Sequence, residues 1–298
     1  MNFRSAVMTE TSDKTVLITG TSSGVGRASA LLMAHLGFEV FAGVRKLRDG
    51  EKLQAEAGVR IVPIVMDVAD PESINTAASA LTTRLGERGL DGLVNVAGIG
   101  TSGPLEYIDP GELKKVFEVN VFGQIAVIQA FVPLLRKTCG RIVNISSVVA
   151  HIAVPFGGAL AASKSAFGSL SDTLRLELRP FGIHVCVVEP GSIHTPAVDK
   201  TLGDVEGRIR RLPPDGARLY GNMLRNFTRR AYAQEQNGSA PEVVARVVSH
   251  ALTARRPRIR YIVGKGARQL TLLPKLIPER ALDHLRMKLF GLPVQFGH

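Results

Sequence analysis

The chain has 298 residues, of which 45% are hydrophobic and 21% are charged, the composition of a globular protein large enough for one α/β domain or two small ones. Tryptophan is absent and only 5% of the residues are aromatic, which argues against a stacking surface for single-stranded nucleic acid, and no zinc-finger spacing indicates DNA binding. The formal net charge of +11 indicates either a solvated basic face or a surface that attracts a phosphorylated cofactor, an acidic carrier or an anionic membrane.

The N-terminal residues 1–12 lack the apolar stretch of a signal peptide and are expected to be disordered. No run of 18 apolar residues occurs, so no membrane-spanning helix is expected. The two cysteines, Cys139 and Cys186, suggest a reducing compartment without a disulfide framework, and we expect a cytoplasmic protein.

Short apolar runs rich in β-branched residues alternate with longer helical patterns. The predicted strands cover residues 15–20, 39–44, 60–68, 92–98, 140–147, 184–191 and 258–264. They are apolar almost throughout, which is typical of parallel strands covered on both faces. The longest predicted helices span about 111–137 and 158–178. The pattern predicts a Rossmann-type α/β fold, a doubly wound parallel sheet with helices on both faces.

Residues 13–265 are predicted to form one domain. The segment 196–238 interrupts the alternation of strands and helices after a late strand, where ligands bind in such folds. It sets apolar residues among glycines, prolines and arginines, so we interpret it as a lid over an apolar substrate, with a plain surface loop as the alternative. Residues 266–298 form a basic, amphipathic extension that packs on the body, on a second subunit or on a membrane surface.

The stretch "LITGTSSGVGRAS" joins the first predicted strand to the first helix. Its glycines let the backbone approach a pyrophosphate, and the helix N-terminus offers free N–H groups. The loop residues expected to bind the cofactor are Gly20, Ser22, Ser23, Gly24, Val25 and Gly26.

The glycine spacing resembles that of the short-chain dehydrogenase/reductase family, classical type, and further motifs follow in family order over residues 13–265. The resemblance implies a seven-stranded sheet in the order 3-2-1-4-5-6-7. "DV", "NVAG" and "EPGSIHTP" match cofactor-binding segments, with Val96 as a departure. Beyond the glycine loop, the resemblance implies cofactor contacts from Asp67, Val68, Asn95, Ala97, Gly98, Lys164, Pro190, Gly191, Ile193 and Thr195. The later half is most similar to the branch that acts on steroids, retinoids and other apolar alcohols and ketones.

The end of the second predicted strand indicates which nicotinamide cofactor binds. NAD-binding proteins usually carry an acidic residue there, which binds the ribose 2′-hydroxyl. Here the strand ends "AGVRK", with Arg45 and Lys46 in place of an acid. Because a guanidinium matches a phosphate through its planar fork of donors, we predict NADP(H), with Arg45 as the main contact.

The resemblance also implies catalytic residues. Ser147 would bind the substrate oxygen, Lys164 would bind the ribose and lower the pKa of a tyrosine, and Asn120 would hold a water that connects the lysine to solvent. The family's tyrosine, which moves the proton, stands four residues before the lysine, where this chain has Leu160. No tyrosine occurs between residues 108 and 219, and leucine cannot transfer a proton.

Three hypotheses follow from the missing tyrosine. The chain is a reductase in which another group or water protonates the oxygen, and the nearest candidates are His151 and His194. Alternatively, the same frame performs a non-redox step such as cyclisation, dehydration or isomerisation. In the third hypothesis the protein is an inactive NADP-binding partner or regulator.

The two longest predicted helices carry more apolar residues than one buried face requires. In the resembling family these helices form the dimer contact, so a homodimer or homotetramer is expected. The expected ligand besides NADP(H) is a hydrophobic small molecule, and no metal or nucleic acid is expected.

Overall fold

The structure is a computed structural model that describes residues 14–295, without the side chains of Leu273 and Lys275. The expected disordered segment 1–12 therefore lies outside the described residues, as do residues 296–298 of the C-terminal extension.

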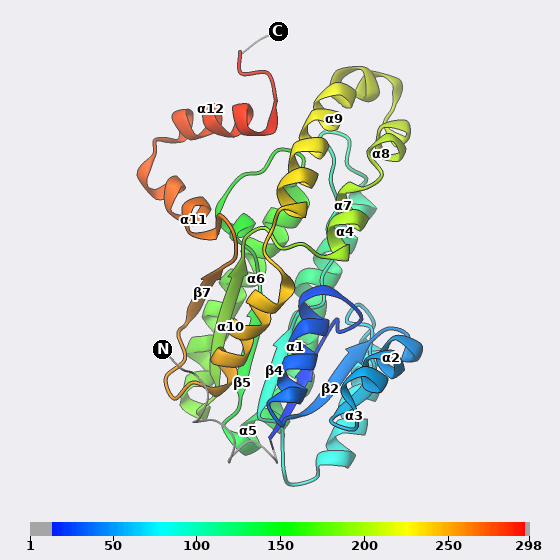
Figure 1. Cartoon of the computed structure of the whole chain (residues 1–298), viewed down its shortest axis with the longest axis vertical. Helices are drawn as coiled ribbons and strands as arrows, with labels where there is room; N and C mark the ends of the chain where they lie inside the picture. The colour runs from blue at the N-terminus through cyan, green and yellow to red at the C-terminus, as the bar shows by residue number, and fades with distance from the viewer. Residues whose placement is uncertain (1–13, 296–298) are drawn as a thin grey trace.

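Within residues 14–295, seven parallel strands form one sheet in the order β3-β2-β1-β4-β5-β6-β7, which confirms the predicted topology (Figure 1). The strands are β1 (Thr15–Ile18), β2 (Glu39–Val44), β3 (Ile61–Val65), β4 (Gly92–Asn95), β5 (Arg141–Ile145), β6 (His184–Pro190) and β7 (Arg260–Val263). The strand order reverses between β1 and β4, so the carboxyl ends of these two strands open a crevice for a ligand.

Most strands are shorter than their apolar runs suggested, mainly at the carboxyl ends. Residues 19–20, 66–68, 96–98, 146–147 and 191 follow the paired strands and belong to the loops. Thr19, Met66, Ser146 and Gly191 still make one backbone hydrogen bond to a neighbouring strand, and the residues after them lie outside the paired strands. The candidate site is built largely from them.

Two layers of helices cover the sheet. One face carries α1 (Gly24–His35), α2 (Leu47–Ala57) and α10 (Pro241–Thr253). The other face carries α3 (Pro71–Leu85), α4 (Pro110–Phe117), α5 (Gly123–Thr138) and α6 (Gly158–Leu178). Three short turns connect these elements, η1 (Glu118–Phe122), η2 (Val148–His151) and η3 (Arg179–Phe181). Apolar side chains between sheet and helices form a buried core on each face of the sheet.

The helix expected over 111–137 is one helical run, Pro110–Thr138, that widens into a π-turn at η1. A side chain at Gly123 would collide with the Val68 carbonyl, so the run passes very close to the loop after β3. Within the described residues, this run is the one helix that is long and apolar enough to cross a membrane by length and composition. More than half of its most apolar window is buried inside the protein, as in the core helix of a globular domain.

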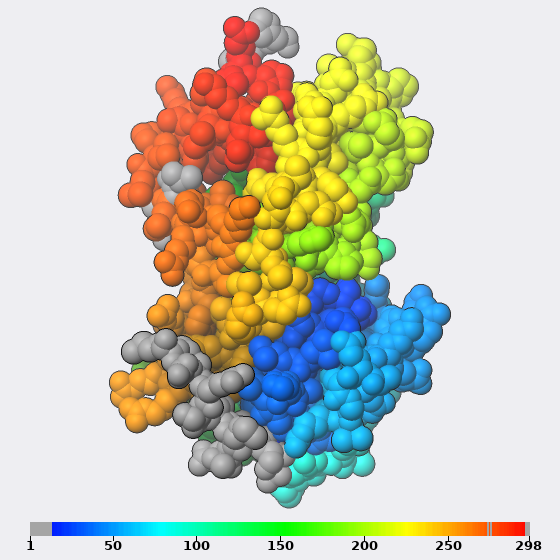
Figure 2. Space-filling model, viewed as in Figure 1, coloured from blue at the N-terminus to red at the C-terminus, as the bar shows by residue number. Residues whose placement is uncertain are grey.

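The segment 196–238 is helical rather than a plain loop. It forms α7 (Pro196–Leu202), α8 (Val205–Arg211) and α9 (Pro214–Gln236). Pro196 and Pro214 stand at the first helical position, where the missing N–H costs nothing, so they start helices instead of breaking them. The C-terminal extension forms α11 (Ala267–Leu276) and α12 (Glu279–Phe290), and α12 packs against α9 (Figures 1 and 2).

Candidate active site

The turn between β1 and α1 has the geometry of a phosphate-binding loop. Gly20 and Gly24 have φ values of 67° and 56°, which favour glycine. A β-carbon at Gly20 would lie 2.9 Å from the Cα atom of Ala97, and one at Gly26 would collide with the Gly20 carbonyl. Ser23 precedes α1 without a side-chain cap, so the first N–H groups of the helix remain available to a ligand. The loop can therefore hold a pyrophosphate, with Ser22 exposed and Val25 half-buried beside it.

The segment after β6 approaches this loop from the other side of the crevice. A β-carbon at Gly24 would lie 3.2 Å from the side chain of Thr195. Pro190 ends β6, and the Gly191 N–H donates to the Val263 carbonyl at 2.8 Å. The Ile193 N–H donates to the Glu235 carboxylate at 3.3 Å, which ties this segment to α9. The structure thus brings together the two sequence motifs that were expected to hold opposite ends of the cofactor.

A cavity of about 350 Å³ lies at the carboxyl ends of β2 and β3. It is lined by Arg45, Asp67, Ala69, Ile99, Lys114, Lys115, Glu118 and Val119. The Asp67 carboxylate accepts from the Ala69 N–H at 3.0 Å, which orients it at the cavity wall, and Val68 is buried beneath it. Arg45 is exposed at the end of β2, where no acidic residue stands. The cavity can receive a nucleotide whose phosphate faces basic side chains.

The loop after β4 connects the cofactor region to the reaction centre. Asn95 is buried, and its amide donates to the Asn144 side chain at 2.9 Å. The Ala97 N–H donates to the Thr19 hydroxyl at 3.0 Å, which fastens this loop to the end of β1. A β-carbon at Gly98 would lie 3.2 Å from the Asn120 amide oxygen and 3.6 Å from Lys164 Nζ. A larger residue at position 98 would crowd these two groups.

Asn120 lies in the π-turn η1 and is fully buried. Its Nδ2 donates to the Ile99 carbonyl at 2.8 Å and to the Ser163 hydroxyl at 3.0 Å, and its Oδ1 accepts from the Ile99 N–H at 2.9 Å. Both ends of the amide are therefore bonded to protein groups. The side chain joins the loop after β4 to α6 and holds the site in shape.

Lys164 projects from α6 into the same region. Its Nζ donates to the Ile145 carbonyl at 2.9 Å, and its side chain is almost completely buried. Burial lowers the pKa of this ammonium group to about 8. Lys164 can therefore exchange a proton near neutral pH.

Ser147 follows β5, at the start of η2. Its hydroxyl donates to the Pro190 carbonyl at 3.4 Å and accepts from the Val149 N–H at 3.3 Å. The first of these bonds is long and therefore weak, so a substrate oxygen can displace it.

Leu160 lies one helical turn before Lys164 on α6. A β-carbon at Gly100 would lie 3.6 Å from the Leu160 Cδ2 atom and 3.1 Å from the side chain of Thr201. Position 160 therefore faces the place where the loop after β4 meets the lid helix α7. The structure gives this position an apolar surface and no donor.

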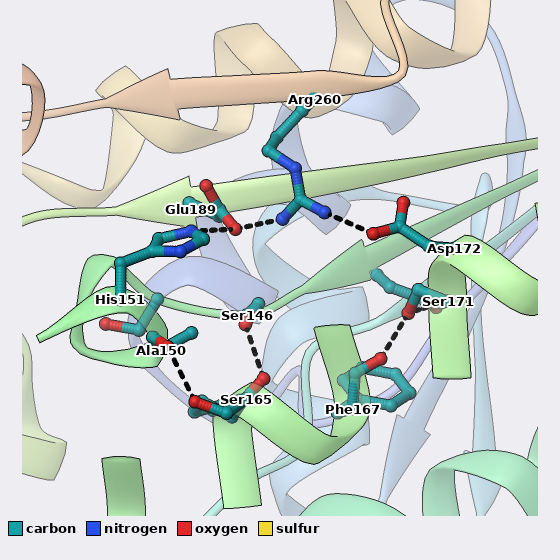
Figure 3. Close-up of polar contacts among 12 residues, drawn as sticks. Ser146, Ala150, His151, Ser165, Phe167, Ser171, Asp172, Glu189 and Arg260 are labelled. Carbon is teal, nitrogen blue, oxygen red and sulfur yellow. Dashed lines mark hydrogen bonds and ion pairs between the residues drawn. The ribbon is translucent and has the colours of Figure 1, made fainter. Parts of the chain in front are cut away.

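The two histidines differ in their surroundings. His151 Nε2 lies 2.8 Å from the carboxylate of Glu189, which also pairs with Arg260 (Figure 3). The side chain of His194 is exposed, and its ring makes no hydrogen bond to a described residue, although its N–H donates to the Ser239 carbonyl at 3.0 Å. Sequence reasoning missed Glu189, although a charged residue inside an apolar buried strand is a signal that it needs a partner.

An apolar cluster joins the segment 196–238 to the loop before α6 and to the C-terminal extension. Phe227 of α9 packs against Phe156 with ring centroids 5.4 Å apart and against Phe290 of α12 at 5.2 Å. Val198 and Leu202 of α7 and Leu292 after α12 complete its buried part. Three separate segments of the chain therefore meet in one apolar cluster: α7 with α9, the loop before α6, and α12.

Comparisons with known proteins agree with this geometry. Residues 14–205 match the family described as short chain dehydrogenase. The chain belongs to the short-chain dehydrogenase family. It is 37% identical to mouse retinol dehydrogenase 5 over 95% of this chain and 91% of that protein. It is 32% identical to rat 17-beta-hydroxysteroid dehydrogenase type 6 over 94% of this chain and 89% of that protein.

A solved relative adds a ligand to the comparison. A short chain dehydrogenase from Burkholderia cenocepacia, crystallised in complex with NADP, matches with a TM-score of 0.69 and 26% identity. The match covers 92% of this chain and 97% of that one. The family assignment, the Rossmann-like fold and the likeness to dehydrogenases of retinol and steroids agree with what the sequence predicted.

Proposed function

We propose that this short-chain dehydrogenase relative is an NADP(H)-dependent oxidoreductase that acts on a hydrophobic ketone, aldehyde or alcohol without the family's tyrosine. The observation that carries the proposal is the grouping of Lys164 Nζ, the Asn120 amide and the Gly98 backbone in the loop after β4, where the neighbouring Ala97 packs against Gly20 of the glycine loop. A cofactor-binding frame and a buried amine with a pKa of about 8 thus meet in one place.

The residues fit a nicotinamide dinucleotide. The glycines at 20, 24 and 26 stand where a β-carbon would crowd or collide with neighbouring protein atoms, so they permit the tight turn, and the free start of α1 favours phosphate. The bound nicotinamide supplies or accepts the hydride. Ser147 binds and orients the substrate oxygen, and Lys164 holds the ribose and a proton at Nζ. The apolar cluster under the lid excludes water.

Arg45 supports the choice of NADP(H) over NAD(H). It lines the cavity with Asp67 and has no carboxylate partner among the described residues. A guanidinium in this position gains a charged ligand from a 2′-phosphate, whereas a 2′-hydroxyl offers it only a neutral one.

The substitution Arg45→Asp tests this choice. We expect it to weaken NADPH binding about 10- to 100-fold, because a charged hydrogen bond is lost and a like charge is added. NADH binding should change little. Both affinities are measured by cofactor fluorescence. The matched control is Arg48→Asp, the same charge change at an exposed residue outside the cavity. Equal losses in both variants would argue against a phosphate contact.

The substrate class follows from the apolar surface. Phe156, Phe227 and Phe290 offer aromatic faces, and the relatives named above are dehydrogenases of retinol and of steroids. The direct experiment is NADPH oxidation followed by absorbance with decanal, retinal and a keto steroid, against a control without carbonyl compound. The absence of turnover with tight NADPH binding would oppose a reductase.

A second candidate is a non-redox reaction such as cyclisation, dehydration or isomerisation. Leu160 favours a non-redox reaction, because it occupies the position of the family's tyrosine, near Gly100 and Thr201, and has no proton to donate. Conversion of a substrate without any change in the nicotinamide would decide for it.

We also propose a homodimer or homotetramer in the cytoplasm. Both cysteines are free, as expected in a reducing compartment. The arm α11–α12 is basic and carries exposed leucines, so it is a candidate for contact with a membrane surface.

A further inference from the structure

The short segment from Ser147 to His151 is attached at both ends to two consecutive residues of β6. At its start, the Ser147 hydroxyl donates to the Pro190 carbonyl. At its end, His151 Nε2 lies 2.8 Å from Glu189 Oε1 (Figure 3). The first contact is long and the second is short, so the His151–Glu189 contact restrains the segment more firmly.

Glu189 is an unusual residue for this place. Its side chain is 0% exposed, yet it carries a carboxylate in a strand that is otherwise apolar. Arg260 pairs with the same oxygen, Oε1, and donates through Nη2 to Asp172 Oδ2 at 2.7 Å. Glu189 Oε2 has no partner among the described groups. A half-satisfied buried carboxylate contributes less to stability than a well-packed apolar side chain, so stability alone does not explain it.

The other side of the segment is held by α6. The Ser165 hydroxyl donates to the Ala150 carbonyl at 2.6 Å, and the Ser146 hydroxyl donates to the Lys164 carbonyl at 3.1 Å (Figure 3). The backbone that carries Ser147 is therefore fixed relative to Lys164 on one side and to β6 on the other. Of the two side chains that tie the segment to β6, His151 makes the shorter contact.

We propose that Glu189 and His151 are positioning residues, which hold the Ser147 hydroxyl in register with Lys164. The imidazole Nε2–H donates to the carboxylate, and we assign the ring to this contact rather than to proton transfer to a substrate. The inference rests on the proposed function, in which Ser147 binds the substrate oxygen. It assigns His151 a different role from the substitute acid that the sequence suggested.

Two substitutions at one position separate positioning from proton transfer. In His151→Gln the amide nitrogen stands as many bonds from the backbone as Nε2, so it can donate to Glu189. In His151→Leu the donor is gone. We expect His151→Leu to lower kcat about tenfold, because small displacements of a reacting group are costly, while His151→Gln keeps most of the activity. NADPH affinity should be unchanged in both, since the phosphate loop is untouched.

The assay follows NADPH oxidation with whichever of decanal, retinal or the keto steroid the wild-type protein reduces fastest. Equal, large losses in His151→Gln and His151→Leu would overturn the inference, because a proton donor cannot be replaced by an amide. Unchanged kcat in His151→Leu would overturn it as well.

The partner residue is tested with Glu189→Met, which keeps the length of the side chain and removes the acceptor. We expect the loss in kcat to match that of His151→Leu, and the double variant to lose no more than either single one, as for residues that act through one contact. Asp172→Asn is the matched control: it weakens the outer ion pair of Arg260 but leaves Glu189 and His151 in contact. A loss in Asp172→Asn equal to that in Glu189→Met would point to the ion-pair network instead. If Glu189→Met does not fold, the two His151 variants still decide.

Ser147→Ala distinguishes failure of the inference from failure of the proposed function. Unchanged turnover in Ser147→Ala would mean that the proposed role of Ser147 is wrong, whatever the His151 variants do. A loss in Ser147→Ala without one in His151→Leu would leave the proposed function standing and remove the positioning role. Adding His151→Leu to Ser147→Ala should cost much less than tenfold, since the group being positioned is already absent.

Discussion

At the scale of single residues, Leu160 decides how the site can move a proton. In Leu160→Tyr a phenol returns one turn from Lys164, where a positioned general acid contributes about 10²–10⁴ in rate. If the protein is a reductase that lacks this donor, NADPH-dependent reduction should rise by roughly tens of fold, because an added group is rarely placed well. Initial rates and NADPH affinity are measured together.

Leu160→Phe is the control for this substitution, because it adds the ring without the hydroxyl. Both rings must fit against Gly100 and Thr201, so overpacking of about 1–3 kcal/mol is expected in each. A lower native activity in both, with no gain in reduction, would favour an apolar pocket for non-redox chemistry. Unchanged rates in two stable variants would mean that position 160 does not face the reacting atoms.

Lys164 makes a second prediction at this scale. Burial lowers its pKa from 10.5 to about 8, so between these pH values the unfolded chain holds more proton at this position than the folded one. The contribution of this group to the free energy of unfolding should therefore rise with pH between about 8 and 10.5. Reduction that needs the ammonium form should fall as the pH passes about 8.

Urea unfolding of the wild-type protein and Lys164→Met across this pH range tests the linkage. The variant should lack the upward slope, because a thioether does not titrate, and it should be inactive at every pH. If the stability of both proteins changes with pH in the same way, the pKa of Lys164 is not lowered in the folded protein.

At the scale of elements, the lid depends on contacts between α9, α12 and the loop before α6. Phe227 lies between Phe156 and Phe290. In Phe227→Ala we expect KM for the apolar substrate to rise at least tenfold while NADPH affinity stays near that of the wild type, since removing a buried phenyl group costs about 3–5 kcal/mol in local packing. Steady-state kinetics and limited proteolysis of residues 196–238 provide the measurements.

The control is Leu219→Ala on the same helix, where the side chain is 48% exposed and lies outside the apolar cluster. It should leave KM and proteolysis unchanged. If Phe227→Ala also leaves KM unchanged, α7–α9 do not cover the substrate.

At the scale of the whole molecule, η1 and α6 expose a few large apolar side chains among polar and charged ones. Many apolar residues of the helical run Pro110–Thr138, which was expected to form a dimer contact, are instead buried in the core, as Val127, Ile128 and Phe131 are. Phe122 and Leu176 remain 59% exposed. We expect a dimer by light scattering at micromolar concentration, and Phe122→Glu with Leu176→Glu should shift it toward the monomer, because a buried unpaired charge is costly.

Leu47→Glu is the matched control, because Leu47 is 51% exposed on α2, which packs on the opposite face of the sheet. It should leave the mass unchanged. A monomeric wild-type protein would remove this prediction.

The sequence by itself determined the sheet. Apolar runs without polar alternation require strands covered on both faces, and glycines at positions 20, 24 and 26 require a tight turn before a helix. The order of motifs along the chain then placed Asp67, Asn120, Ser147 and Lys164 at the carboxyl edge, where the structure has them. The strands and the glycine turn are local properties that neighbouring residues reveal, whereas those four residues were found through the resemblance to the family.

Tertiary structure decided the rest. The fold brings residues together that are 22 to 101 positions apart in the sequence. Arg45 lines a cavity with Asp67, Thr201 lies next to Gly100, and Glu189 contacts His151. The same is true of Asn120, whose side-chain amide is bonded to Ile99 and Ser163. Such contacts depend on how helices, strands and loops from distant parts of the chain pack together. The sequence around each residue does not show which distant residue becomes its neighbour.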